Sequence, residues 1–229
     1  MSRMYRHELK FFCAEAELRL MEEKIKHVCA KDPHVDAEGK YRIRSMYFDT
    51  YDSGCYRENE SGADNRAKYR IRIYNGSDAV IKLERKGSIR DRKYKDSCNI
   101  TRAQCEQLLQ GHPVENVLQE QRVLWEFLAE RQMEVLRPCV IVEYVRTPYI
   151  YPVGNIRITF DRYITSSSSM DFFEKEIPGR GIMPEHVHLL EVKYDEILPA
   201  TIPELLNGTC SLRRTSFSKY ALCREYSMK

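Results

Sequence analysis

The chain has no apolar run that approaches the roughly 20 residues of a membrane-spanning helix, so we expect no membrane insertion. Its eight cysteines include no CxxC pair, and we see no signal peptide. This predicts free thiols in a reducing cytosol rather than a disulfide framework. The net charge is only +3, from 37 basic and 34 acidic residues. A non-specific nucleic-acid binder usually has a larger basic excess, so nucleic acid is not an expected partner.

Familiar catalytic motifs are also missing. There is no GxxxxGK[ST] loop, no GxGxxG fingerprint and no GxSxG elbow. His186-Val-His188 puts two imidazoles on one strand face, a spacing that can bind metal. No further cysteine or histidine follows at metal-site spacing, which favours ordinary strand histidines. Because we see no linker and no internal repeat, we expect one α+β domain over residues 1–229.

The chain does contain strands with one charged face. Residues 68–75 and 79–86 alternate in this way, and Asn75-Gly-Ser-Asp78 joins them as a tight hairpin. Side chains two residues apart share a face of a strand. The charged faces carry Arg70 and Arg72 in the first strand, and Lys82, Glu84 and Lys86 in the second. A single such hairpin is more typical of an antiparallel sheet with a solvated outer face.

The same alternation recurs in residues 4–12, 155–161 and 189–193, and residues 91–100 form a further expected strand. The side chains on the charged faces of these strands are Arg6, Glu8, Lys10, Lys93, Lys95, Arg157, Asp161, Glu191 and Lys193. If the charged faces meet in a closed barrel, the lumen is charged, the apolar faces lie outside and no sheet edge is left. Unpaired buried cations are strongly disfavoured, so such a lumen is expected only around a highly charged ligand.

The rest of the chain is expected to form helices, two further strands and loops. Helical spacing covers residues 15–28, 103–110, 115–133, 202–206 and 215–226. Residues 41–50 and 140–149 are typical of strands, whereas 57–64 and the serine-rich 165–170 are expected to be loops.

The chemistry that these strands favour is the binding of phosphate. Arginine forks and lysine point charges suit phosphate oxygens, so cations from several strands can surround a chain of phosphates. Glu191, together with Glu8 or Glu84, can hold a Mg²⁺ or Mn²⁺ ion that bridges the phosphates, because these ions prefer oxygen ligands. Alternatively, acids such as Glu84 and Asp161 only neutralise the neighbouring lysines and arginines.

Seven short motifs follow one another along the chain: Glu8-Leu-Lys10, Ser45-Met-Tyr-Phe-Asp49, Lys68-Tyr-Arg-Ile-Arg72, Leu83-Glu-Arg-Lys86, Arg157-Ile-Thr-Phe-Asp161, Leu190-Glu-Val-Lys193 and Phe217-Ser-Lys-Tyr220. In this order they resemble the VTC domain, the polyphosphate polymerase domain of the vacuolar transporter chaperone complex, which also occurs as stand-alone bacterial proteins. Each motif is weak alone, but together they cover essentially the whole chain. The family belongs to the triphosphate tunnel metalloenzymes, so the resemblance implies a closed eight-stranded antiparallel barrel around a charged tunnel, with flanking helices.

The resemblance also implies roles for individual residues. The implied phosphate-binding cations, with those nearest the reaction first, are Arg70, Arg72, Lys86, Arg157, Lys219 and Lys10. Ser218 is implied to assist Lys219, and Glu191, with Glu8, to bind the metal. Arg57 matches a further family arginine, although it lies in an expected loop. Alternation adds as lumen cations Lys82, Lys93, Lys95, Arg146 and Lys193.

The chain departs from a related branch at its first strand. The CYTH branch begins with ExExK, whereas Arg6 replaces the first acid here. This disfavours a two-carboxylate metal site on that strand, and with it an adenylate cyclase or a thiamine triphosphatase. The resemblance implies a Mn²⁺- or Mg²⁺-dependent phosphotransferase that moves the γ-phosphoryl group of ATP onto polyphosphate. A tripolyphosphate or nucleoside triphosphate hydrolase and a non-catalytic polyphosphate-binding module need the same cations, so both alternatives stay open.

Overall fold

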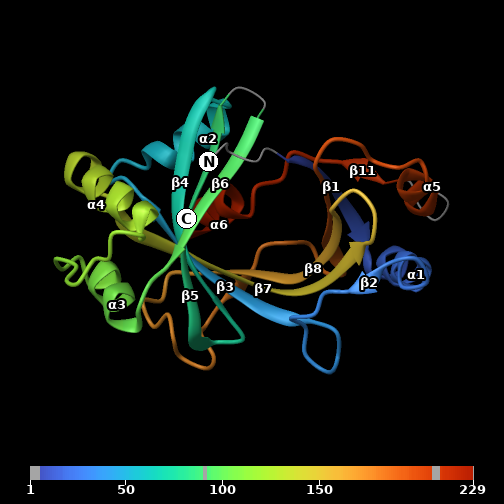
Figure 1. Ribbon diagram of the computed structural model, residues 1–229, viewed down its shortest axis with the longest axis horizontal. Helices are drawn as coiled ribbons and strands as arrows, with labels where there is room; N and C mark the ends of the chain where they lie inside the picture. Colours follow the sequence, from blue (N-terminus) through green and yellow to red (C-terminus); the bar gives the residue numbers. More distant parts are fainter. Residues whose placement is uncertain (1–5, 90–91, 208–211, 229) are drawn as a thin grey trace.

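Alternating strands form one antiparallel sheet, with helices in the connections between them. The computed structural model describes residues 6–89, 92–207 and 212–228 (Figure 1). The long strands in this part of the chain are β1 (His7–Ala14), β3 (Tyr41–Asp49), β4 (Asn65–Tyr74), β5 (Ser77–Ile89), β6 (Arg92–Asn99), β7 (Arg137–Tyr151), β8 (Ile156–Ser167) and β10 (Val187–Tyr194). Two-residue strands extend the sheet: β2 (Ala30–Lys31), β9 (Arg180–Gly181) and β11 (Arg213–Arg214). The helices are α1 (Glu15–Ile25), α2 (Gly54–Ser61), α3 (Arg102–Gln110), α4 (Arg122–Glu134), α5 (Thr201–Asn207) and α6 (Lys219–Met228).

The expectation of a closed barrel is wrong. The sheet runs β11-β1-β10-β8-β7-β3-β4-β5-β6, and no backbone ladder joins β1 to β6 within the described residues. Instead, β11 pairs with the end of β1, and the Thr215 N–H donates to the Lys10 carbonyl at 2.9 Å. Closure requires a strand tilt and a register stagger that bring the two edges together. Alternation predicts only which face a side chain takes, so it could not predict whether the edges meet.

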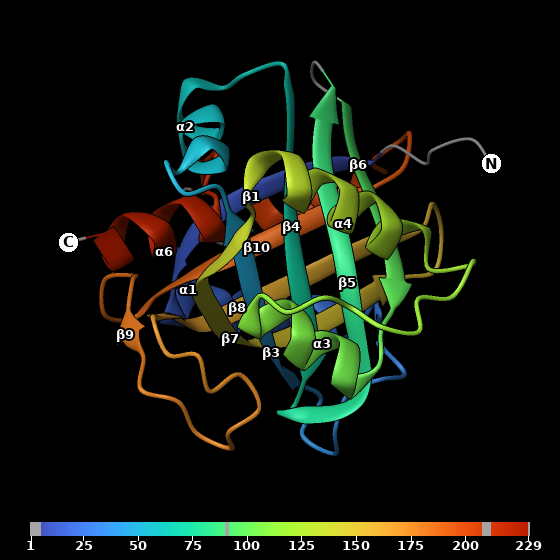
Figure 2. The same cartoon turned by 90° about the vertical axis from the view of Figure 1, so that its left-hand side faces the viewer.

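The sheet bends strongly into two limbs, with α6 between them (Figure 1). Figure 2 shows α3 and α4 lying across the outer face of the β4–β5–β6 limb. There Ile71 and Leu83 pack in one apolar cluster with Phe127 of α4. On the other limb, Ile158 and Leu190 pack in a cluster with α1 and α5. The apolar strand faces therefore lie against outer helices, as alternation predicted, and each fully buried large side chain contributes roughly 1.5–3 kcal/mol.

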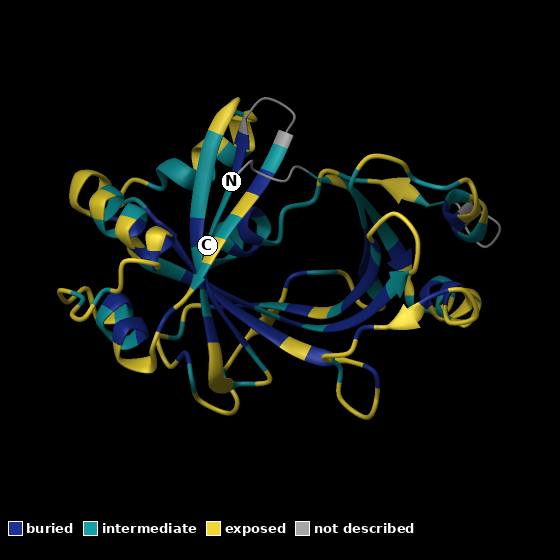
Figure 3. Ribbon diagram, in the orientation of Figure 1, coloured by how far each residue is buried: buried dark blue, intermediate teal, exposed yellow. Residues whose placement is uncertain are grey.

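Helix α6 lies on the concave side of the sheet, where it packs against β7 and β8. Its Tyr220 is buried beside Tyr47 and Tyr144 of the strands, and the Tyr220 hydroxyl donates to Asp49 at 2.5 Å. Much of this packing belongs to the buried interior (Figure 3). The anchored helix carries its first residue, Lys219, to the charged inner face of the sheet.

Several elements differ from the expected ones, and at two of the helix starts side-chain hydrogen bonds fix the local backbone. The expected loop 57–64 overlaps α2, which has no buried residue and begins where Thr50 Oγ1 accepts from the Gly54 N–H at 2.7 Å. Helix α4 begins only at Arg122, because buried Gln121 accepts from the Leu118 N–H and donates to the Asn99 carbonyl. Helix α6 begins at 219 rather than 215, and residues 165–167 belong to β8.

Some expectations fall partly outside the described residues. Residues 4–5 of the first expected strand, residue 91 of the expected strand 91–100 and Cys210 lie there. The other seven cysteines are free thiols. His188 is buried with its Nε2 2.6 Å from Glu15, whereas the side chain of His186 is 78% exposed. Among the described residues, no group of three or more His, Cys, Asp or Glu is arranged to hold a metal.

Candidate functional site

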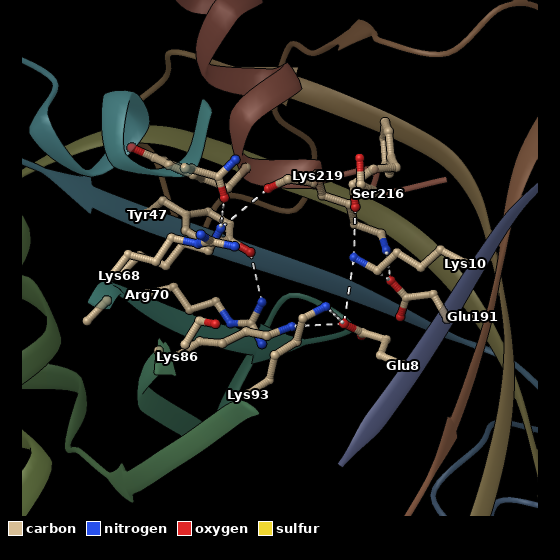
Figure 4. A pocket seen from close by; sticks show the side chains of 18 of the residues that line it. Glu8, Lys10, Tyr47, Lys68, Arg70, Lys86, Lys93, Glu191, Ser216 and Lys219 are labelled. Carbon is tan, nitrogen blue, oxygen red and sulfur yellow. Dashed lines mark hydrogen bonds and ion pairs between the residues drawn. The ribbon is translucent and has the colours of Figure 1, made fainter. Parts of the chain in front are cut away.

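The charged inner face surrounds two adjoining cavities. The first, which we call the helix chamber, has a volume of about 150 Å³ and reaches Asn59 of α2 and residues 216–220 at the start of α6 (Figure 4). The second, the tyrosine chamber, has a volume of about 380 Å³ and reaches Tyr41 and Tyr74. Both are bounded by a shared wall: Glu8, Arg70, Arg72, Lys86, Lys93, Arg146 and Lys193. Ten basic and two acidic side chains line the helix chamber, so positive charge dominates it.

Glu84 holds the arginines of β4 in place. Its carboxylate accepts from Arg70 Nε at 2.6 Å and from Lys95 Nζ at 3.2 Å, and Arg72 lies 3.8 Å away. Burial opposes ionisation of Glu84, but Arg70 and Arg72 outweigh it and hold the pKa well below its ordinary value. Arg70 Nη1 also donates to the Tyr47 hydroxyl at 2.8 Å, and Arg72 Nε donates to the Ser45 hydroxyl at 3.2 Å. The two guanidinium groups are therefore fixed before a ligand arrives.

Asp161 and Glu191 hold a second group of cations. Arg146 donates to both oxygens of Asp161 at 2.6 and 2.7 Å, and Lys219 contacts the same carboxylate at 2.7 Å. Glu191 accepts from Lys219 at 2.8 Å and from Arg146 and Lys193 at 3.1 Å. Burial opposes the charge on Lys219, yet the two acids raise its pKa above the ordinary value. Lys219 is therefore held as a cation at the N-terminal end of α6.

Glu8 contacts four lysines from different strands. Its oxygens lie 3.4 Å from Lys93 and Lys193, 3.5 Å from Lys86 and 3.7 Å from Lys10. These distances are longer than those of a strong charge-assisted hydrogen bond, about 2.7–2.9 Å. One carboxylate thus neutralises part of a ring of ammonium groups and binds none of them tightly (Figure 4).

The ring leaves positive charge without an acidic partner. No carboxylate of the described residues lies within 4 Å of Lys68 Nζ, which contacts Asn59 at 3.1 Å and the Ser218 hydroxyl at 3.3 Å. Burial and the adjacent Lys86 hold the pKa of Lys68 well below its ordinary value. Glu8 raises the pKa of Lys86, but burial, Lys10 and Lys193 outweigh it and bring that pKa to about 7. A polyanion that enters the chambers would relieve this repulsion.

The matching family is the one that the motifs indicate. Its model, the VTC domain, matches residues 5–228. The chain belongs to the VTC domain family. No curated protein matches the sequence. Family membership and the cationic chambers together support an activity on triphosphate or polyphosphate, of a kind that generally depends on a divalent metal.

Solved structures share the fold of this VTC domain at low sequence identity. A putative adenylate cyclase from Bacillus halodurans is 13% identical, with a TM-score of 0.53 and 91% of each chain covered. The PH1819 protein from Pyrococcus horikoshii OT3 is 14% identical, with a TM-score of 0.52 and coverage of 97% of this chain and 99% of that one. A chain of the Schizosaccharomyces pombe Mediator head module is 10% identical, with a TM-score of 0.50 and coverage of 93% and 100%. No helix in the described part of the VTC domain has the length and apolar character to cross a membrane.

The structure brings most of the expected site residues together. The helix chamber is lined by Glu8, Lys10, Arg70, Arg72, Lys86, Lys93, Arg146, Glu191, Lys193, Ser218 and Lys219. Lys82, Lys95 and Arg157 line only the tyrosine chamber, where Arg157 contacts Asp32 at 2.5 Å. Arg57 lines neither chamber: its side chain is 62% exposed and pairs with Asp52 on the surface.

Sequence reasoning missed several polar groups of the helix chamber, among them Lys68 and Asn59. Lys68 stands two residues before Arg70 on the same strand face, so the alternation that selected Arg70 could also have selected it. Asn59 carries no comparable signal, because it lies on α2, which was expected to be a loop.

The acids of the VTC domain fit a divalent metal only where substrate phosphates complete its coordination. Glu8 and Glu191 both line the helix chamber, and each is already shared among cations. Thr159, the register partner of Glu191, is fully buried, and its hydroxyl has no hydrogen-bond partner among the described residues. Mg²⁺ is commonly bound through one or two carboxylates and completed by substrate phosphates and water. The residues fit such a shared site and do not form a cage for metal alone.

Proposed function

We propose that this protein is a metal-dependent polyphosphate polymerase that transfers the γ-phosphoryl group of ATP onto a polyphosphate chain. The observation that carries the proposal is the shared wall, in which six basic side chains face two chambers at once. A single wall of this kind can hold donor and acceptor phosphates in one line. Membership of the VTC domain family supports the same reaction.

In the proposed reaction, a terminal oxygen of the acceptor chain forms a bond to the γ-phosphorus of ATP. The bond from that phosphorus to the β–γ bridging oxygen breaks, and ADP leaves with the bonding electrons. The acceptor oxygen is already ionised, so neither a side-chain nucleophile nor a general base is needed. Catalysis then consists of positioning and charge stabilisation, as in other phosphoryl transfers.

The arginines and lysines have different parts in this reaction. Glu84 holds Arg70 in position, so its guanidinium needs no reorganisation when charge shifts onto the phosphates. Lys10, Lys193 and Lys219 surround Glu191 and would turn toward the phosphates once a cation takes their place. Glu191 and Glu8 would hold Mn²⁺ or Mg²⁺, which offsets phosphate charge when bound.

The decisive experiment incubates the purified protein with ATP and Mn²⁺ and resolves the products by chain length, with Arg72→Ala as a matched control. Long chains together with ADP support the polymerase, and the variant should form them far more slowly. Orthophosphate alone would assign hydrolysis instead. Unchanged ATP, combined with tight tripolyphosphate binding, would leave a binding module. A polymerase, a hydrolase and a binding module all need the same cations, so only the products distinguish these three functions.

A further inference from the structure

The tyrosine chamber differs from the helix chamber in size and in what lines it. At about 380 Å³ it lies within the range of roughly 300–1,000 Å³ that is typical of pockets for small organic ligands, whereas about 150 Å³ for the helix chamber lies below it. Its lining combines apolar side chains, among them Tyr41, Ile43 and Tyr74, with the cations of the shared wall. A ligand with a flat organic head and a polyanionic tail matches this combination.

The two tyrosines, Tyr41 and Tyr74, differ in burial and in how firmly their rings are held. Tyr41 is 6% exposed, and its hydroxyl accepts from Arg157 at 2.7 Å, so its ring is fixed. The Tyr74 ring meets it edge-on, with centroids 5.8 Å apart and an angle of 77°. Tyr74 is only half-buried and ends β4, opposite Ile43 in register. It therefore has ring surface left for a ligand, and Tyr41 supports it from the side.

The shared wall indicates which way a nucleotide would lie between the two chambers. Arg72 lies two residues before Tyr74 on the same face of β4, and Arg70 two residues before that. Along this one strand the lining thus changes from an aromatic ring to two guanidinium groups and then to Lys68 in the helix chamber. A nucleoside triphosphate has the same order of an aromatic base followed by phosphates.

We propose that the base of the donor nucleotide stacks on Tyr74 in the tyrosine chamber, with its phosphates along the shared wall and the polyphosphate end in the helix chamber. This inference rests on the proposed function in taking ATP as the ligand. Because an aromatic ring stacks on any base, and because the described residues that line this chamber include no amide side chain, ATP and GTP should bind with similar affinity.

The test compares dissociation constants for ATP and for tripolyphosphate, measured in EDTA so that no turnover occurs. Base–aromatic stacking is worth about tenfold or more in affinity. Tyr74→Ala should therefore weaken ATP about tenfold and leave tripolyphosphate within twofold, whereas Tyr74→Phe, which keeps the ring, should bind both normally. Tyr51→Ala is the matched control, because Tyr51 is 74% exposed and lines neither chamber. An equal loss for both ligands, or no loss for ATP, would overturn the proposal.

A second measurement does not depend on the folding of a variant. Photolabelling the wild-type protein with 8-azido-ATP in EDTA should modify peptides that contain Tyr41 or Tyr74. Labelling of the Phe217 peptide in the helix chamber would place the base at the opposite end and sink the proposal. These outcomes can be distinguished from those of the polymerase assay. If Tyr74→Ala weakens ATP binding but the wild-type protein forms no polymer, the polymerase proposal fails and the nucleoside site stands. If polymer forms but Tyr74→Ala binds ATP normally, the nucleoside site fails and the polymerase proposal stands.

Discussion

The helix chamber and the tyrosine chamber share six cations but are completed by different parts of the chain. The helix chamber is closed by α2 and the start of α6, and it contains Glu191 and the carboxylate-free Lys68. The tyrosine chamber is closed by the ends of β3 and β4, with aromatic side chains. Alternating strands thus build a common phosphate-binding wall. The two ends are made unequal by α2 and α6 at one end and by the aromatic side chains at the other.

The arginines and the lysines of the two chambers have different roles, the first in positioning phosphates and the second in attracting negative charge. Arg70 and Arg146 are each held by a buried carboxylate at 2.6 Å, so they keep their geometry with or without a ligand. Burial and neighbouring cations lower the pKa values of Lys68 and Lys86, and acids do not fully compensate them. The arginines are suited to orient phosphates, and the under-compensated lysines make the empty site receptive to negative charge.

The largest effect is expected for Glu191, which lines only the helix chamber. Glu191→Gln keeps the shape but removes the charge that a hard divalent ion requires. Turnover should fall by at least about 100-fold, since even outer-shell changes at metal sites cost about 10- to 100-fold. Tripolyphosphate affinity in EDTA should stay the same or rise, because Lys193 and Lys219 lose an acidic partner. Steady-state rates across a Mn²⁺ titration and binding isotherms in EDTA measure the two quantities.

Glu8→Gln serves as the comparison, because Glu8 belongs to the shared wall. If Glu191 only neutralises lysines, both variants should keep wild-type turnover and an unchanged Mn²⁺ dependence. That result would remove the metal role from the helix chamber, and the two chambers would then differ only in shape and in their other lining residues.

The next effect concerns the shared wall. Arg72→Ala should weaken ATP and tripolyphosphate alike by about 30-fold, because one charge-assisted contact is worth about 1.5–3 kcal/mol. The empty protein should be no less stable, since Glu84 keeps Arg70 as its closest partner. Arg70→Ala, by contrast, removes that partner from buried Glu84 and should lower the melting temperature by about 10 °C. A large loss of stability in the ligand-free Arg72 variant would make Arg72 a structural residue instead.

A smaller effect should appear in the pH dependence of the empty protein. The pKa of Lys86 is about 7 in the folded state and near 10.5 when unperturbed, so the unfolded chain binds more protons between these values. Stability should therefore rise with pH through this window. We expect the melting temperature to rise by about 5 °C from pH 7 to 9. Affinity for tripolyphosphate should fall over the same range, because the ligand requires the charged ammonium.

Lys86→Met is the control for this titration. Its melting temperature should change less with pH than that of the wild type, although Lys10 and Lys68, whose pKa values are also lowered, leave part of the slope. Equal slopes for the two proteins would show that Lys86 is fully charged in the empty site.

Much of the candidate site follows from strand alternation. Two-residue spacing placed Arg70, Lys86 and Glu191 on one inner face, because neighbouring strands share that face wherever they pair. Buried charge alone is a poorer guide. Arg44 is fully buried, yet it lies on the outer face, where it donates to Glu143 at 2.5 Å and to the Phe172 carbonyl at 2.9 Å.

The features that could not be predicted depend on contacts between distant segments. Whether β1 meets β6 depends on the curvature of the sheet, and the segment after α5 occupies part of the free edge of β1 instead. At the start of α2, the N–H groups of Gly54 and Cys55 donate to the Thr50 and Asp49 side chains, and no apolar periodicity reveals this helix. The position of Lys68 beside Ser218 required the docking of α6, 150 residues away.

The smallest effect is expected for Arg57, which the family resemblance groups with the phosphate-binding residues. Its side chain is 62% exposed and pairs with Asp52, and surface pairs of this kind contribute about 0–1 kcal/mol. Because it lines neither chamber, Arg57→Ala should leave affinity for ATP and tripolyphosphate within twofold and turnover unchanged. Lys68→Met, which changes a cation inside the helix chamber, is the matched comparison and should weaken tripolyphosphate about tenfold. A loss in the Arg57 variant as large as that of the Lys68 variant would mean that α2 moves toward the helix chamber when phosphate binds, and that this chamber is completed only by its ligand.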